Sequence, residues 1–70
     1  MNQCERIMQY MEEFGSITPL EAMEEFGIMR LASRIHDLRA QGVEIEAETE
    51  FSKNRYGEKV HYTRYKLVNK

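Results

Sequence analysis

The feature that most constrains this chain is a pair of short helical segments separated by a glycine, Gly27. Thr18 and Pro19 mark the start of the first segment, because a threonine hydroxyl caps a helix and proline fits the first helical position, where no N–H is needed. Glu21 can return the capping bond to Thr18. Gly27 ends the helix because glycine adopts a left-handed backbone without steric cost, and helical periodicity resumes soon afterwards. The sequence therefore predicts two helices joined by a tight turn.

A further amphipathic segment precedes this pair, so we expect three helices, over about residues 2–14, 19–26 and 29–41. The middle helix is too short to persist alone and must be held by its neighbours. The residues expected to face the core recur every three or four positions: Cys4, Ile7, Met8, Met11, Phe14, Leu20, Met23, Phe26, Ile28, Leu31, Ile35 and Leu38. Two helices joined by a tight glycine-containing turn form a helix-turn-helix unit, whose second helix usually enters the major groove of DNA.

The apolar period then changes from helical to alternating. Apolar or β-branched residues alternate with four glutamates over about residues 43–50, which predicts a half-buried strand. The polar residues 52–59 are expected to form the tip of a hairpin, and residues 60–68 the returning strand. Across this hairpin the glutamates can face Arg64 and Lys66, in pairs that stabilise the register by about 0.2–1 kcal/mol each.

The alternation of the returning strand changes phase along its length. Val60 and Tyr62 belong to one face, whereas Tyr65 and Leu67 belong to the other. A β-bulge inserts one residue and reverses the facing of those that follow. We therefore expect a bulge near Thr63.

These elements predict an α+β fold in which a three-helix helix-turn-helix core is followed by a β-hairpin wing. The length of 70 residues predicts a single domain, which comprises residues 1–70. The hairpin would cover one side of a helical core that is too small to close by itself.

Charge is sorted along the chain although the net charge is only −2. Residues 1–27 carry six acidic residues and one basic residue, and residues 42–50 carry four glutamates. Residues 28–41 carry three arginines against one aspartate, and residues 51–70 carry six basic residues against one glutamate. The field at a contact surface depends on this distribution more than on the total. The third helix and the hairpin are therefore the candidate nucleic-acid surfaces.

At this point the sequence resembles a known family, the small winged helix-turn-helix proteins encoded widely in phages and prophages. The resemblance runs from Arg6 to Leu67 and is carried, in this order, by GSITPLEA (15–22), RLASRIHDLRAQG (30–42), NRYGEKV (54–60) and TRYKL (63–67). It implies a winged DNA-binding domain with no catalytic residues and no cofactor.

The exposed side of the third helix is expected to present Met29, Arg30, Ser33 and Arg34 to DNA. An arginine can fork onto the O6 and N7 atoms of guanine, a serine can reach a base edge or a phosphate, and a second arginine can bind a phosphate. Asp37 would repel phosphates and is expected to orient an arginine or to form a salt bridge elsewhere. The alternative interpretation of this face is a solvated, charged helix surface.

The hairpin tip contributes Lys53, Asn54, Arg55 and Lys59 as a second candidate DNA-binding set. A basic hairpin that projects from a core can lie along the DNA backbone or reach into the minor groove. Gly57 is expected to supply a positive φ at the tip. The alternative is a charged loop that contacts no ligand.

The sequence gives little support for a metal site, a catalytic site or a membrane span. The spacing of Cys4, His36 and His61 matches no zinc pattern, and we expect no metal site. No arrangement for nucleophilic catalysis and no glycine-rich phosphate loop is visible, so we expect no enzyme. The chain has no apolar run of the roughly 18 residues that span a bilayer. Its lone cysteine excludes an internal disulfide, and we expect a cytoplasmic protein.

The sequence therefore predicts binding to double-stranded DNA, in phage gene regulation or DNA processing. About four to six phosphate contacts would give weak binding, so useful specificity would need a homodimer, a partner protein or clustered sites. The competing hypothesis is a winged-helix protein-interaction module whose acidic surface, formed by residues 1–27 and 44–50, binds a basic partner without DNA.

Overall fold

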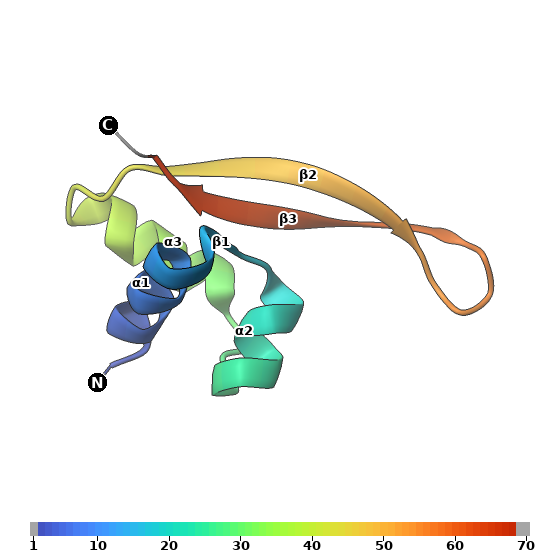
Figure 1. The fold of residues 1–70 in the computed structure, drawn as a ribbon, viewed down its shortest axis with the longest axis horizontal. Helices are drawn as coiled ribbons and strands as arrows, with labels where there is room; N and C mark the ends of the chain where they lie inside the picture. The colour runs from blue at the N-terminus through green and yellow to red at the C-terminus, as the bar shows by residue number, and fades with distance from the viewer. Residues whose placement is uncertain (1, 69–70) are drawn as a thin grey trace.

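Three helices pack against one end of a long, twisted hairpin in the computed structural model, which describes residues 2–68 (Figure 1). The elements in chain order are α1 (Gln3–Phe14), β1 (Ser16–Ile17), α2 (Pro19–Phe26), α3 (Leu31–Ala40), β2 (Ile45–Lys53) and β3 (Lys59–Leu67). The strands form an antiparallel sheet in the order β1-β3-β2. The predicted α+β arrangement, a helix-turn-helix core followed by a hairpin wing, is confirmed.

The start of α2 is set by the reciprocal bonds expected from its sequence. The backbone N–H of Glu21 donates to the Thr18 hydroxyl at 3.2 Å, and the Thr18 N–H donates to the Glu21 carboxylate at 2.8 Å. Gly27 ends the helix with φ of 67° in the left-handed region. A second capping box, between Asn2 and Glu5, begins α1.

The core lies between the three helices and the base of the sheet. Its buried apolar residues are Ile7, Met11, Ile17, Ala22, Ile28, Leu31, Ile35, Leu38 and Ile45. Ile17 is fully buried while its backbone pairs with β3, so the short segment between α1 and α2 fills the core and also extends the sheet.

Three residues predicted to be buried are exposed: Phe14 to 64%, Leu20 to 65% and Met23 to 40%. In α2 the side facing the core is formed by Ala22 and Phe26, which are four residues apart and therefore lie on one face. This rotation of the helix turns Leu20 and Met23 outward. Phe14 is the last residue of α1 and packs on the ring of Tyr10 at the surface.

The observed element boundaries differ slightly from the expected ones. Helix α3 begins at Leu31, so Met29 lies in the turn before it and Arg30 occupies its N-cap position. Strands β2 and β3 run to Lys53 and from Lys59, so they continue further into the wing than residues 43–50 and 60–68 implied.

The predicted bulge near Thr63 is wrong. Pairing between β2 and β3 is continuous from Ile45 opposite Leu67 to Lys53 opposite Lys59. Directly opposed residues share a face of the sheet. Tyr65 and Leu67 pack with Ile45 against the helical core, whereas the other face carries Tyr62 and Arg64 beside α2. The apolar alternation changes phase because one face of the twisted hairpin packs on the helical core and the other face lies beside α2.

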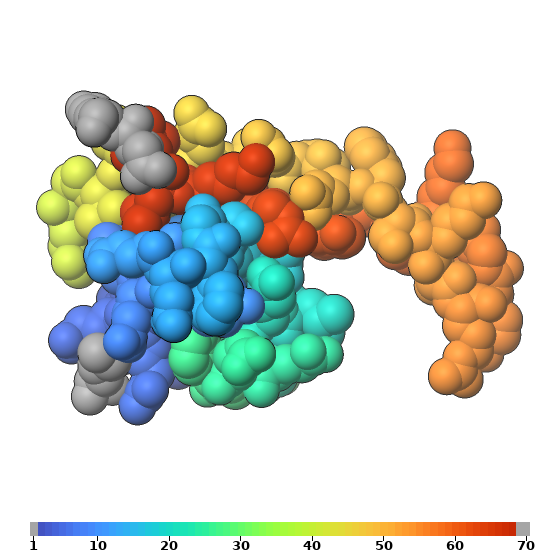
Figure 2. Space-filling view, in the orientation of Figure 1, coloured from blue at the N-terminus to red at the C-terminus, as the bar shows by residue number. Residues whose placement is uncertain are grey.

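The outer half of the hairpin extends beyond the helices (Figure 2), and the molecule measures 39 Å along its longest axis. Within β2, Ile45 at the base is buried, but Ala47 and Thr49 are exposed. The alternation of residues 43–50 predicted a strand half-buried along its length. The helices cover only the base, so the remaining apolar positions of β2 lie outside the core.

Candidate nucleic-acid interface

The N-terminal turn of α3 brings together the residues predicted to contact DNA. Arg30 is exposed at the N-cap, and its carbonyl accepts the backbone N–H groups of Ser33 at 3.1 Å and Arg34 at 3.3 Å. Positions three and four residues apart lie on one side of a helix, so these three residues form one surface. Met29 precedes them in the turn and is 79% exposed.

Asp37 pairs with Arg34, so of the two alternatives that the sequence left open it orients an arginine of its own helix. The Arg34 Nη2 atom lies 3.3 Å from a carboxylate oxygen of Asp37, one helical turn onward. The Arg34 Nε atom is buried without a hydrogen-bond partner among the described residues. The Arg34 side chain is nevertheless 36% exposed, so its guanidinium is oriented by Asp37 at the protein surface.

Helix α3 differs from the other two described helices in how it begins. Side chains cap the N-termini of α1 and α2 through complete capping boxes, whereas Arg30 makes no side-chain capping bond to α3 and the first turn of α3 has no acidic residue. Backbone N–H groups at the start of a helix need partners, and the helix dipole there favours an anion. The start of α3 is therefore suited to a phosphate group.

The hairpin tip is organised by Asn54. Its side-chain oxygen accepts backbone N–H groups from Tyr56 at 2.9 Å and Glu58 at 3.1 Å, and its amide nitrogen donates to the Glu58 carboxylate at 3.3 Å. Gly57 has φ of 77°, as expected. The structure thus places the Asn54 side chain within the loop, with its polar atoms bonded there.

The other three wing residues present positive charge. Lys53, Arg55 and Lys59 are all exposed. Lys53 and Lys59 are direct cross-strand partners at the last pair of the ladder. Like charges in directly opposed positions destabilise a hairpin, and an anion bound between them would relieve the repulsion.

Arg64 fixes the hairpin against the helical part of the fold. Its Nε atom lies 2.9 Å from Glu50 on β2, and its Nη1 atom lies 3.0 Å from the Ser16 hydroxyl and 3.6 Å from the Glu21 carboxylate. The hydrogen bonds from Arg64 and Tyr62 lower the pKa of the Glu50 carboxyl. The sequence indicated pairing of Arg64 across the hairpin but not its contacts with Ser16 and Glu21, which depend on the placement of α2 beside β3.

A groove of about 690 Å³ separates α2 and the following turn from the middle of the hairpin. Leu20 and Met29 line its helical side, and Tyr62 and Arg64 line its hairpin side. Met29 therefore faces the space between the helix-turn-helix unit and the wing, rather than standing alone on the exposed side of α3.

The described residues do not meet the requirements of a metal site or of a membrane-spanning helix. Within residues 2–68, no three His, Cys, Asp or Glu side chains gather as metal ligands would. Cys4 is partly buried, with its Sγ atom 4.0 Å from the carbonyl oxygen of Arg34. None of the described helices combines the length and apolar character needed to cross a bilayer.

Comparison with known proteins agrees with this geometry. No curated protein and no solved structure matches the chain. The family model described as a winged helix-turn-helix domain matches residues 2–70, and domains of this type are in general DNA-binding modules rather than catalysts. With nearly its whole length matched, and with three helices followed by a hairpin wing, this chain belongs to the winged helix-turn-helix domain family.

Proposed function

We propose that this domain binds double-stranded DNA, with the start of α3 in the major groove and the wing on the flanking backbone or minor groove. The observation that carries the proposal is the position of positive charge in a chain of net charge −2. Arg30 and Arg34 lie at the N-terminal turn of α3, and Lys53, Arg55 and Lys59 lie at the end of the projecting hairpin. These are the two places from which a winged helix reaches DNA.

The residues of α3 have distinct roles in this proposal. Arg30, which is exposed, donates two hydrogen bonds to guanine or binds a phosphate. Ser33 contacts a base edge or phosphate, and Arg34, oriented by Asp37, binds the DNA backbone. The N–H groups at the start of α3 donate hydrogen bonds to a further phosphate. Met29 borders the groove beside the wing and is placed to contact a thymine methyl.

The wing provides the sequence-independent part of the affinity. Lys53, Arg55 and Lys59 neutralise phosphates, while Asn54 holds the loop that presents them. A single domain with about four to six phosphate contacts binds weakly at physiological salt. The domain would therefore act as a dimer, with a partner protein or at clustered sites, in phage or prophage gene regulation or DNA processing in the bacterial cytoplasm.

The test is fluorescence anisotropy with a labelled random duplex of about 20 base pairs at low and moderate salt, since affinity carried by phosphate contacts falls as salt rises. We expect micromolar binding at low salt that is lost at moderate salt. Arg30→Ala should weaken binding, and the double variant Arg30→Ala/Arg34→Ala should weaken it further. Arg6→Ala, which removes an exposed arginine from α1, should bind as the unchanged protein does.

Two results would contradict the proposal. One is the absence of binding at low salt, which would favour the alternative of a protein-interaction module. The other is full affinity in the double variant with its fold intact, which would show that α3 does not carry the DNA contact.

A further inference from the structure

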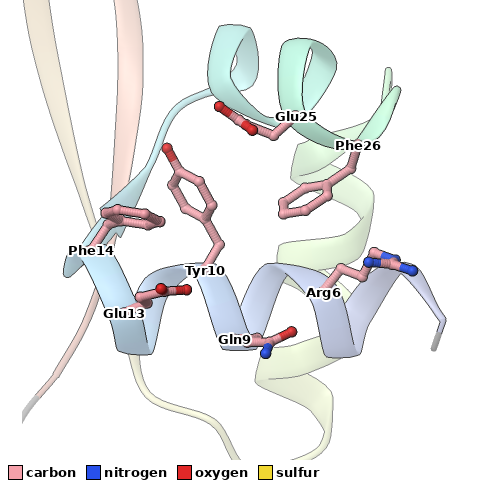
Figure 3. Close-up of a pocket in the computed structure, with 7 residues that line it drawn as sticks. All are labelled: Arg6, Gln9, Tyr10, Glu13, Phe14, Glu25 and Phe26. Atoms are coloured by element: carbon pink, nitrogen blue, oxygen red, sulfur yellow. The ribbon is translucent and has the colours of Figure 1, made fainter.

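A pocket lined by aromatic rings lies between α1 and α2 (Figure 3). Its volume is about 260 Å³. Tyr10 and Phe14 come from α1 and Phe26 comes from α2. The ring centroids of Tyr10 and Phe14 are 4.6 Å apart with the rings tilted by 44°, and those of Tyr10 and Phe26 are 5.7 Å apart with the rings nearly perpendicular. The three rings thus present faces in different directions around one hollow.

The pocket is set in a negative environment. The carboxylates of Glu13 and Glu25 line it, and residues 1–27 carry six acidic residues against one basic residue. Burial raises the pKa of the Tyr10 hydroxyl, and the nearby carboxylates of Glu21 and Glu25 raise it further, whereas Arg64 acts in the opposite direction. Carboxylates therefore lie near the Tyr10 hydroxyl as well as along the pocket wall.

Among the described residues that line the pocket, Arg6 is the one cation, and its charged group lies away from the hollow. Arg6 lines one end of the pocket, and Figure 3 shows its guanidinium beyond Phe26, at the opposite end from Phe14. Phe14 is 64% exposed, which is a large apolar area to leave in water at a helix end. The end of the pocket formed by Tyr10, Phe14 and Glu13 is consequently open to an incoming group.

Aromatic faces and carboxylates together favour one kind of ligand. The negative face of an aromatic ring attracts a cation, and a carboxylate accepts its hydrogen bonds. Arginine suits this combination better than lysine, because its planar guanidinium stacks on a ring while its fork of N–H donors reaches oxygens at the edge. We propose that this pocket binds an arginine side chain from a basic segment of a partner protein.

The proposed contact is separate from the proposed DNA interface. No residue of α3 or of the hairpin lines this pocket within the described chain, so DNA and the partner could be bound at the same time. The acidic surroundings would repel nucleic acid and attract a basic polypeptide. The inference therefore adds a protein-docking surface to the domain and does not depend on whether α3 binds DNA.

The test is an NMR titration of the protein with N-acetyl-arginine amide, compared with the neutral N-acetyl-citrulline amide. We expect saturable shifts of the Tyr10, Phe14 and Phe26 ring signals at millimolar arginine and none with citrulline. Losing one ring from such a site should weaken binding about fivefold. Phe14→Ala should show this loss, whereas Phe51→Ala, which removes an aromatic ring that is 74% exposed on the wing, should bind unchanged.

Two charge variants probe the electrostatic part. Glu25→Gln should weaken arginine binding, and Arg6→Gln should strengthen it because a like charge leaves the pocket. Equal shifts with arginine and citrulline, equal affinity for N-acetyl-lysine amide, or unchanged binding in a folded Phe14→Ala would overturn the proposal. If Phe14→Ala does not fold, unchanged binding in Glu25→Gln decides against it.

Discussion

The two halves of the hairpin are built from the same two strands but are held in different ways. At its base, Ile45 is buried and Tyr65 packs against the helical core, while Arg64 links β2 to β1 and α2. Beyond that point the exposed fraction of Phe51 is 74% and that of Tyr56 is 80%. Long-range packing fixes the base, whereas the ladder, the Asn54 loop and the ring contact between Phe51 and His61 hold the outer half.

The comparison shows how a small domain can present charged residues away from its core. The outer half needs no buried surface because its register is set at the base and its turn is closed by Asn54. Glutamates on β2, an edge strand of the sheet, discourage pairing with other chains. The residues at the tip are consequently available to a ligand.

The largest loss of stability should come from a substitution that removes packing at the base of the hairpin. Ile17→Ala removes a fully buried side chain that packs in the core and should lower the free energy of unfolding by about 2–5 kcal/mol. Phe51→Ala in the outer half should change it by no more than about 0.5 kcal/mol. Urea denaturation followed by circular dichroism measures both, and similar losses in the two variants would contradict the comparison.

Arg64→Gln should have an intermediate effect, about 1–2 kcal/mol, because it removes charged hydrogen bonds to Glu50 and Ser16. The matched control is Lys66→Gln, which breaks an exposed pair with Glu48 at 3.0 Å and should cost less than about 1 kcal/mol. Urea denaturation compares the two variants. An equal loss of stability in the two variants would indicate that Arg64 contributes no more than an exposed salt bridge.

The smallest effect is a dependence of stability on pH. The Arg64 hydrogen bond lowers the pKa of Glu50 in the folded chain below its ordinary value of 4.5. A group of this kind stabilises the fold above its unfolded pKa, and that stability is lost as the pH falls through the lowered folded value. Unfolding measured at decreasing pH should therefore show a loss below about pH 4.5 that is smaller in Glu50→Gln. An identical pH profile in Glu50→Gln would show that this carboxyl does not contribute.

Features set by neighbouring residues could be predicted from the sequence. The start and end of α2 follow from Thr18, Glu21 and Gly27, which act within their own helix. The pairing of Arg34 with Asp37 also follows from spacing along one helix. Each of these features depends only on the chemistry of a few adjacent positions, so it does not change with the packing of the rest of the fold.

Features set by packing between elements could not be predicted in the same way. The exposure of Leu20 depends on Ala22 being the contact that brings α2 to the core. The expectation of a bulge at Thr63 assumed one buried face, whereas the hairpin uses two. The position of the Asn54 side chain within the loop could have been predicted from the sequence, because asparagine often bonds to the backbone of its own turn.

The most direct test of the account is the salt dependence of duplex binding when the tip is neutralised. In the triple variant Lys53→Ala/Arg55→Ala/Lys59→Ala, we expect the slope of log K against log salt to fall in magnitude by about 2–3, since each phosphate contact contributes about 0.9. Stability should not fall, because the tip buries nothing and the variant removes the repulsion between the opposed Lys53 and Lys59. Arg6→Gln should leave the slope as it is. A folded triple variant with the slope of the unchanged protein would contradict the central claim that the wing is held out to bind DNA.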